Sequence, residues 1–324
     1  MISRFSVCVF LMFVGIATLG FSGNANAADG EMDFEDYYQA NAGNSSEMTI
    51  PDGSYELDNS LALDPELTIK GRAAMSVQIT NVKMYNYVFL KIGGKNVTVD
   101  GITFNNVILK INNADGITIK DCDFRFSTDF INECIGSIAG SENVRYVNCT
   151  FQAVKSDFFI SDCERILLSD TELDGVNCFT YRSSDVEISK CAFRNSKINI
   201  LVEDGKDFQI IDNAFSDSET GISIDSTDPP LISNNRFSNM SIGISLYQKL
   251  TNAYLDDNSF ENVDDELSLS YVTGDVGPVT GEKILKANFF YVLMFTVLVM
   301  IIAFVYAKIR LNKARPGQAK KGGE

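Results

Sequence analysis

Hydrophobic and polar residues alternate in short stretches that recur through the middle of the chain. In VEISKCAF (186–193), Val186 and Ile188 alternate with polar residues, two polar residues interrupt the alternation, and Cys191 and Phe193 resume it. Alternation with a period of two residues is typical of a half-buried β-strand. The motif therefore predicts a strand, a bend and a second short strand.

The motif returns at a nearly fixed interval. Close copies are ITIKDCDF (117–124), VRYVNCTF (144–151), FQIIDNAF (208–215) and PLISNNRF (230–237), and looser copies are VTVDGITF (97–104), ILLSDTEL (166–173) and AYLDDNSF (253–260). The last residues of the copies are Phe104, Phe124, Phe151, Leu173, Phe193, Phe215, Phe237 and Phe260, separated by 20, 27, 22, 20, 22, 22 and 23 residues. Such regular self-similarity is typical of a solenoid.

A further apolar stretch precedes most copies, as in INILV (198–202), GISI (221–224) and GISL (243–246). Each unit therefore predicts three short strands joined by turns, and successive units would stack in parallel about 4.8 Å apart. A leucine-rich repeat is the alternative, but it expects Leu three residues before the motif. The residues at that position are Gly94, Ala114, Ser141, Cys163, Ser183, Gly205, Thr227 and Leu250, which favours the β-solenoid.

The stretch TIPDGSYELDNSLALDPELTIKGR (49–72), with Pro51, Gly53 and Tyr55, resembles the opening of right-handed parallel β-helix proteins of the pectate-lyase and NosD-like type. The resemblance covers about residues 47–265. It implies an all-β fold, a right-handed single-stranded parallel β-helix of about 9–11 coils. This scaffold hosts lyases, hydrolases, epimerases, adhesins and binding proteins, so the resemblance does not specify an activity.

Stacking converts each motif position into a column along the solenoid. The eight-membered Phe column is expected to fill the core. Two residues before it, Asn213, Asn235 and Asn258 predict a ladder of hydrogen-bonded amides. In the same column, Cys122 and Cys149 would lie on adjoining turns, within disulfide distance, and form either a disulfide or two buried thiols.

Both ends of the chain carry predicted targeting segments. The N-terminus has Arg4, an apolar run and small residues ending at Ala27, which is typical of a secretory signal. Near the C-terminus, 21 uncharged residues would span about 31 Å as a helix, enough for a bilayer. The basic residues that follow place the tail in the cytoplasm. The predicted segments are a signal peptide (1–27), a leader or N-terminal cap (28–46), a β-helix ectodomain (47–266), a stalk (267–286), a single transmembrane helix (287–307) and a basic cytoplasmic tail (308–324).

Charge and composition exclude several functions. Residues 28–286 carry 20 basic and 42 acidic side chains, and this acidity argues against a nucleic-acid partner. The chain has no histidine, which excludes a Ser-His-Asp triad, the Gly-His-Gly motif of pectin hydrolases and His-ligated metal sites. We therefore expect no metal and no cofactor, except Ca²⁺ if the protein is a lyase.

Four residues form the candidate site. Glu203, Asp225 and Tyr247 are expected to face solvent on consecutive turns, with Arg182 one turn earlier. They predict glycan binding. Alternatively, Glu203 and Asp225 act as catalytic carboxylates, or the patch is only a solvated acidic surface. The turns are short except in the 27-residue interval, where STDFINECIG (127–136) is the one expanded loop.

Three functions follow from these observations. The first is a non-enzymatic, membrane-anchored cell-surface module that binds glycan or a protein partner, or that contributes to the cell envelope. The second is a polysaccharide lyase or hydrolase, and the third is an accessory subunit of a membrane complex. Sequons for N-glycosylation occur at Asn44, Asn96, Asn148 and Asn239.

Overall fold

The computed structural model describes residues 32–73, 76–81, 87–127, 134–228, 230–247, 255 and 257–269. The predicted signal peptide, transmembrane helix and cytoplasmic tail lie outside these residues, as does most of the predicted stalk. Within the described ranges, no helix is both long enough and apolar enough to cross a bilayer.

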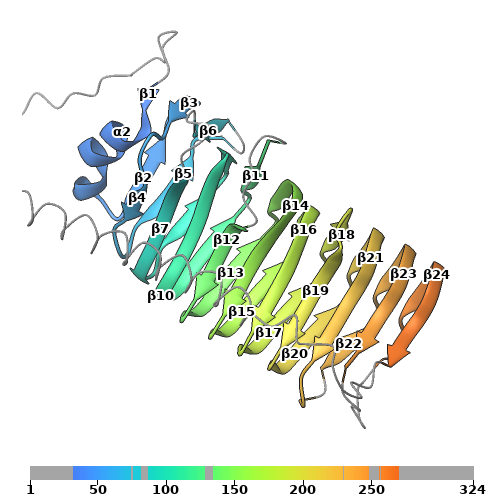
Figure 1. Cartoon of the computed structure of the whole chain (residues 1–324). Helices are drawn as coiled ribbons and strands as arrows, with labels where there is room; N and C mark the ends of the chain where they lie inside the picture. The colour runs from blue at the N-terminus through green and yellow to red at the C-terminus, as the bar shows by residue number, and fades with distance from the viewer. Residues whose placement is uncertain are drawn as a thin grey trace, which may run out of the picture. The chain divides into compact units, whose positions relative to one another are not determined.

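The described chain is a parallel β-solenoid of about 10 turns, and its strands follow one another from β2 to β24 in Figure 1. Most full turns contain three strands, as the repeat predicts, and the strands of successive turns pair in parallel to form three faces. The first face contains β2 (Glu47–Ile50), β5 (Thr68–Gly71), β8 (Thr98–Asp100), the C-terminal half of β10 (Val107–Lys120), β13 (Glu142–Val147), β15 (Glu164–Ser169), β17 (Ser184–Ser189), β20 (Lys206–Ile211) and β22 (Leu231–Ser233).

The other two faces share several long, bent strands. The second face contains β1 (Met32–Asp33), β3 (Gly53–Glu56), β6 (Val77–Thr80), β9 (Ile102–Asn105), β11 (Asp123–Arg125), β18 (Ala192–Arg194) and the first parts of β14 (Thr150–Ser161), β16 (Glu172–Tyr181), β21 (Ala214–Asp225), β23 (Arg236–Leu246) and β24 (Ser259–Leu269). The third face contains β4 (Leu61–Leu63), β7 (Val88–Lys95), β12 (Cys134–Ala139), β19 (Ile198–Glu203), the first half of β10 and the remaining parts of the long strands.

A short helix covers the N-terminal end of the solenoid. Helix α2 (Phe34–Asn41) begins at Asp33, whose side chain accepts a hydrogen bond from the Asp36 N–H at 3.0 Å, and the 3₁₀ helix η1 (Ala42–Asn44) follows it. Phe34 and Tyr38 are buried, and the Tyr38 hydroxyl accepts a hydrogen bond from the Asp64 N–H at 2.8 Å. Of the two interpretations of residues 28–46, the described part is therefore a cap, which shields the apolar end of the first turn.

The phenylalanine column fills the core. Paired strands place one member on each turn, and neighbouring rings stack with centroids 4.6–5.1 Å apart and planes within 14°. Leu173 interrupts the stack between Phe151 and Phe193 and is itself buried. Burying each large apolar side chain contributes about 1.5–3 kcal/mol, so this column is a main source of stability.

The column two residues earlier is polar yet buried. The Asn213 side chain donates to Asn235 Oδ1 at 3.1 Å, and Asn235 donates to Asn258 Oδ1 at 3.0 Å. Each of these amides also donates to a backbone carbonyl of the preceding turn. Cys122 and Cys149 hold the corresponding positions on earlier turns as free, buried thiols, directed at the carbonyls of Val99 and Ile119. The described chain thus has the predicted amide ladder and, of the two alternatives for the cysteines, thiols.

Left-handed backbone conformations form the corners between faces. Most of the non-glycine residues with positive φ are Asn or Asp, including Asp121, Asn148, Asp170, Asp212 and Asn234, which occupy equivalent corners on different turns. Short polar side chains tolerate this conformation better than other residues with a Cβ. The turns therefore favour the recurrent Asn and Asp of the repeat, although Lys190 adopts the same conformation at an equivalent corner.

Candidate functional site

The predicted carboxylates lie side by side on the third face. Strand pairing places Tyr181 next to Glu203, and Glu203 next to Asp225. The Tyr247 N–H donates to the Ile224 carbonyl at 3.0 Å, which puts Tyr247 beside Asp225 on the following turn. Glu203 and Tyr181 are half-buried, whereas Asp225 and Tyr247 are exposed. The side chains form one outward column, named here the Tyr181–Tyr247 column.

Arg182 lies one turn before Glu203 but outside this column. The position in register with Glu203 belongs to Tyr181, and Arg182 occupies the adjacent corner with a positive φ of 44°. Its guanidinium lies 4.5 Å from the centre of the Tyr181 ring, and its Nε is 3.0 Å from Asp162 Oδ1. Arg182 therefore contacts the column by stacking on Tyr181.

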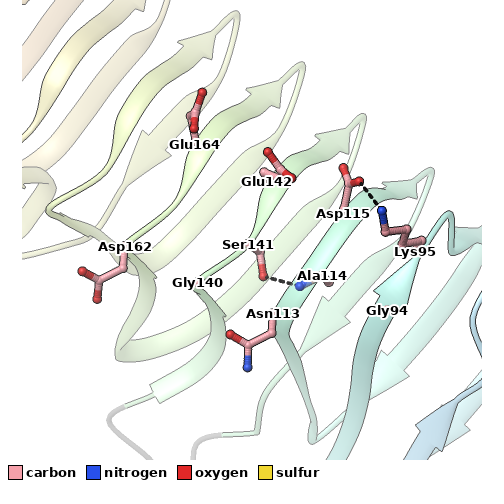
Figure 2. A pocket seen from close by; sticks show the side chains of 10 residues that line it. All are labelled: Gly94, Lys95, Asn113, Ala114, Asp115, Gly140, Ser141, Glu142, Asp162 and Glu164. Carbon is pink, nitrogen blue, oxygen red and sulfur yellow. Dashed lines mark hydrogen bonds and ion pairs between the residues drawn. The ribbon is translucent and has the colours of Figure 1, made fainter.

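A polar groove lies next to the column, where the third face turns into the first. The groove has a volume of about 430 Å³, and its lining residues are Gly94, Lys95, Asn113, Ala114, Asp115, Gly140, Ser141, Glu142, Asp162 and Glu164. In Figure 2, Asp115, Glu142 and Glu164 follow one another on successive strands, and Asn113 and Asp162 lie across the corner from them. Three small residues, Gly94, Ala114 and Gly140, are part of the lining at this corner.

The carboxylates of the groove are held by cations and amides. Lys95, Asp115, Glu142 and Glu164 are in register on four turns. Lys95 lies 3.6 Å from Asp115, and Arg165 pairs with both Glu142 and Glu164. The pKa of Asp115 is lowered, first by the hydrogen bond from the Asn143 amide and then by the charge of Lys95. The groove therefore presents carboxylates whose positions are fixed by neighbouring cations and amides.

Asp162 connects the two surfaces, because it lines the groove and pairs with Arg182. The groove itself was not predicted from the sequence. One signal was available: the residues after the small turn residue of each repeat are Lys95, Asp115, Glu142 and Glu164, a run of charges at a fixed motif position. The sequence did not predict Tyr181 as a member of the column. Its neighbour Thr180 is polar yet buried, so the alternation of apolar and polar residues does not show that Tyr181 faces outward.

Other predicted positions are distributed over the solenoid. Asn96, Asn148 and Asn239 are exposed corner residues with positive φ, and the amides of Asn148 and Asn239 donate to Asp121 and Asp217 of the preceding turns. The Asn44 side chain and residues 128–133 of the expanded loop lie outside the described part of the chain. Glycosylation at the four sequons stays a prediction.

The solenoid is similar to solved structures of low sequence identity. A surface protein and adhesin of Streptococcus pneumoniae, PfbA, matches with a TM-score of 0.53 and 12% identity, over 73% of this chain and 95% of that one. An alginate lyase from a Paenibacillus species matches with a TM-score of 0.52 and 9% identity, over 71% and 96% of the two chains. At such identities the similarity shows the fold alone. A search of curated proteins finds no significant match.

The family described as "Periplasmic copper-binding protein (NosD)" matches residues 90–271. Proteins bind copper through His, Cys and Met side chains. This chain has no histidine, and in the described ranges no three His, Cys, Asp or Glu side chains gather as a metal site. Five of the six described thiols are buried, so the described donors do not fit a copper centre. The match covers more than half of the chain, however, and the protein belongs to this family of right-handed parallel β-helix proteins.

Proposed function

We propose that the solenoid is a non-catalytic, outward-facing module that binds a glycan chain along the third face. The observation that carries the proposal is the Tyr181–Tyr247 column: an aromatic ring, two carboxylates and a second aromatic ring follow one another on consecutive turns. Such a row repeats every 4.8 Å or so along the solenoid. It therefore offers a linear polymer a series of similar contacts.

The chemistry of the column suits carbohydrate. The rings of Tyr181 and Tyr247 provide flat apolar surfaces with a polar tip, and the carboxylates of Glu203 and Asp225 accept hydrogen bonds from hydroxyl groups. Arg182 adds donors at one end and leads to the polar groove. A few placed polar groups beside aromatic surfaces are typical of a small-molecule or sugar site.

Charge narrows the class of glycan. Glu203 and Asp225 lie directly in register. Like charges in register repel each other, and an anionic polymer such as a uronic-acid chain would add to this repulsion. A neutral glycan avoids the penalty, and an amino sugar with a free ammonium group would relieve it. We therefore propose a neutral or amino-sugar polymer as the ligand.

A glycan array with the full chain in detergent micelles tests the proposal. The double variant Glu203→Gln, Asp225→Asn removes both charges of the column without changing side-chain size. The matched control, Glu187→Gln with Asp212→Asn, also removes two charges. Glu187 lies on the first face, in β17, and Asp212 lies at the corner that follows β20. We expect the first variant to lose binding of amino-sugar chains by about tenfold or more, and the control to retain it.

The same experiment separates the alternatives. Equal binding by both double variants would place the ligand elsewhere on the surface. Shortened glycan products, formed by the natural chain and absent with Glu203→Gln, Asp225→Asn, would show instead a lyase or hydrolase that uses these carboxylates. Absence of any bound glycan would favour a protein partner or an envelope role.

A further inference from the structure

The C-terminal end of the solenoid differs from its N-terminal end. Strand β24 is the last described strand, and in the described part of the chain it pairs only with β23. Its opposite edge therefore presents a row of backbone N–H and C=O groups to any strand that approaches it. At the other end, α2 covers the first turn with the buried side chains of Phe34 and Tyr38.

Core positions are exposed on this last turn. Leu267 is in register with Ile244, yet Leu267 is 41% exposed and Ile244 is 1% exposed. Phe260 and Val263 are half-buried, whereas their partners on β23, Phe237 and Met240, are buried. Each of these apolar side chains would gain burial from one more strand.

The chain that follows does not continue the repeat. Residues 270–286 contain neither Phe nor Asn, the residue types that recur in the phenylalanine stack and in the amide ladder. A further turn that carries both Phe and Asn in these columns would therefore come from outside residues 270–286.

Charge distinguishes between possible occupants. Strand β24 carries Glu261, Asp264, Asp265 and Glu266 and no Lys or Arg. Two copies that met edge to edge through β24 would bring eight acidic side chains together, which like-charge repulsion opposes. A strand with basic side chains would complement this edge instead. The acids would then select the partner as well as prevent self-association.

We propose that the outer edge of β24, which has no partner strand among the described residues, is a docking surface for a cationic β-strand of another protein, which adds to the solenoid as its next strand. The main-chain hydrogen bonds of the added strand supply affinity, and its Lys or Arg side chains meet Asp264 to Glu266. This surface is separate from the Tyr181–Tyr247 column, and the inference does not depend on glycan binding.

The probes are two synthetic 11-residue peptides, one that alternates Val with Lys and one that alternates Val with Glu. Binding to the full chain in detergent micelles is measured by fluorescence anisotropy at low and physiological salt, and amide hydrogen exchange locates the bound peptide. We expect the Lys peptide alone to bind and to slow exchange in β24. Asp264→Lys should weaken its binding by about tenfold, and Glu219→Lys, which reverses an exposed charge on β21, should not.

Four outcomes of the peptide experiment would overturn the inference, and a fifth comes from the protein without peptide. The four are binding of neither peptide, equal binding of both, protection located outside β24, and equal loss of affinity in the two variants. Protection of β24 that rises with protein concentration in the absence of peptide would also overturn it, by showing that the occupant is a second copy.

Discussion

Asn213 donates two hydrogen bonds to one atom of Asn235: the Asn235 Oδ1 atom accepts from the Asn213 backbone N–H at 2.9 Å and from the Asn213 side-chain amide at 3.1 Å. The Asn235 amide in turn donates to Asn258 and to the Ile210 carbonyl. Both residues are buried. Each amide thereby satisfies polar groups that would otherwise be costly to bury, and it fixes the register of neighbouring turns.

Two adjacent asparagines should respond differently to the same substitution. Asn235→Asp removes both amide donors and buries a carboxylate, so at pH 7 it should lower the free energy of unfolding by at least about 3 kcal/mol. Asn234→Asp, at an exposed corner with positive φ, should change it by less than about 0.5 kcal/mol.

Acid should reduce the penalty of Asn235→Asp. Burial raises the pKa of the new carboxyl above its unfolded value, so the folded state binds the proton more tightly. The loss of stability caused by Asn235→Asp is therefore smallest below the pKa that the new carboxyl has in the unfolded chain, and it grows as the pH rises above that pKa. Urea denaturation of both variants at pH 4 and pH 7 measures the effect, and similar losses for both at pH 7 would contradict a buried ladder.

The phenylalanine stack should dominate core stability. Phe193→Ala leaves a cavity beside Phe215, whose ring lies 5.1 Å away, and should cost about 3–5 kcal/mol. Phe193→Leu should cost less, because Leu173 already occupies the same column on the preceding turn. Chemical denaturation gives both values, and a loss below about 1 kcal/mol for Phe193→Ala would mean that this ring contributes little to the core.

Alkaline pH should destabilise the solenoid through its buried thiols. Burial raises the pKa of Cys149, Cys178 and Cys191 to about 12, whereas unfolded thiols ionise near pH 8.5 or so. Above the pKa of the unfolded thiols, the unfolded state binds fewer protons than the folded state. The free energy of unfolding is therefore unaffected by these thiols below that pH and falls as the pH rises above it.

The variant Cys149→Thr, which copies Thr171 of the same column, tests this linkage. Its loss of stability between pH 8.5 and pH 10 should be smaller than that of the natural chain by up to about 2 kcal/mol. Equal losses would show that the Cys149 thiol does not contribute to the loss of stability at alkaline pH. In an alkylation experiment, the half-buried thiol of Cys134 serves as the comparison for the buried thiols.

Arg182 should matter for binding more than for folding. Its pair with Asp162 is about half exposed on both sides, and exposed pairs contribute at most about 1 kcal/mol. Arg182→Ala should therefore leave the unfolding midpoint nearly unchanged while it weakens glycan binding, through loss of the contact with Tyr181. A large loss of stability with unchanged glycan affinity would assign Arg182 to the fold alone.

The predicted membrane anchor has a direct test. Removing 287–324 from the exported chain should release a folded soluble body, because the uncharged stretch 287–307 lies within the deleted part. Cell fractionation followed by circular dichroism measures both properties. A truncated body that stays with the membrane would show that another segment retains it.

The amino-acid sequence predicted the repeat, the three strands of each turn and the columns of Phe and Asn. It did so because a solenoid is built from local units, and a fixed interval places equivalent residues directly above one another. It also placed Glu203 and Asp225 on neighbouring turns for the same reason. Three other features depend on how the turns pack in space, which a repeat interval does not encode. Tyr181 rather than Arg182 lies in that column because Arg182 occupies the corner with a positive φ. The groove is lined by residues from four successive turns, which only the stacked structure brings together. The exposure of Leu267 arises only because no described strand follows β24, and that is a property of the stack rather than of any one repeat.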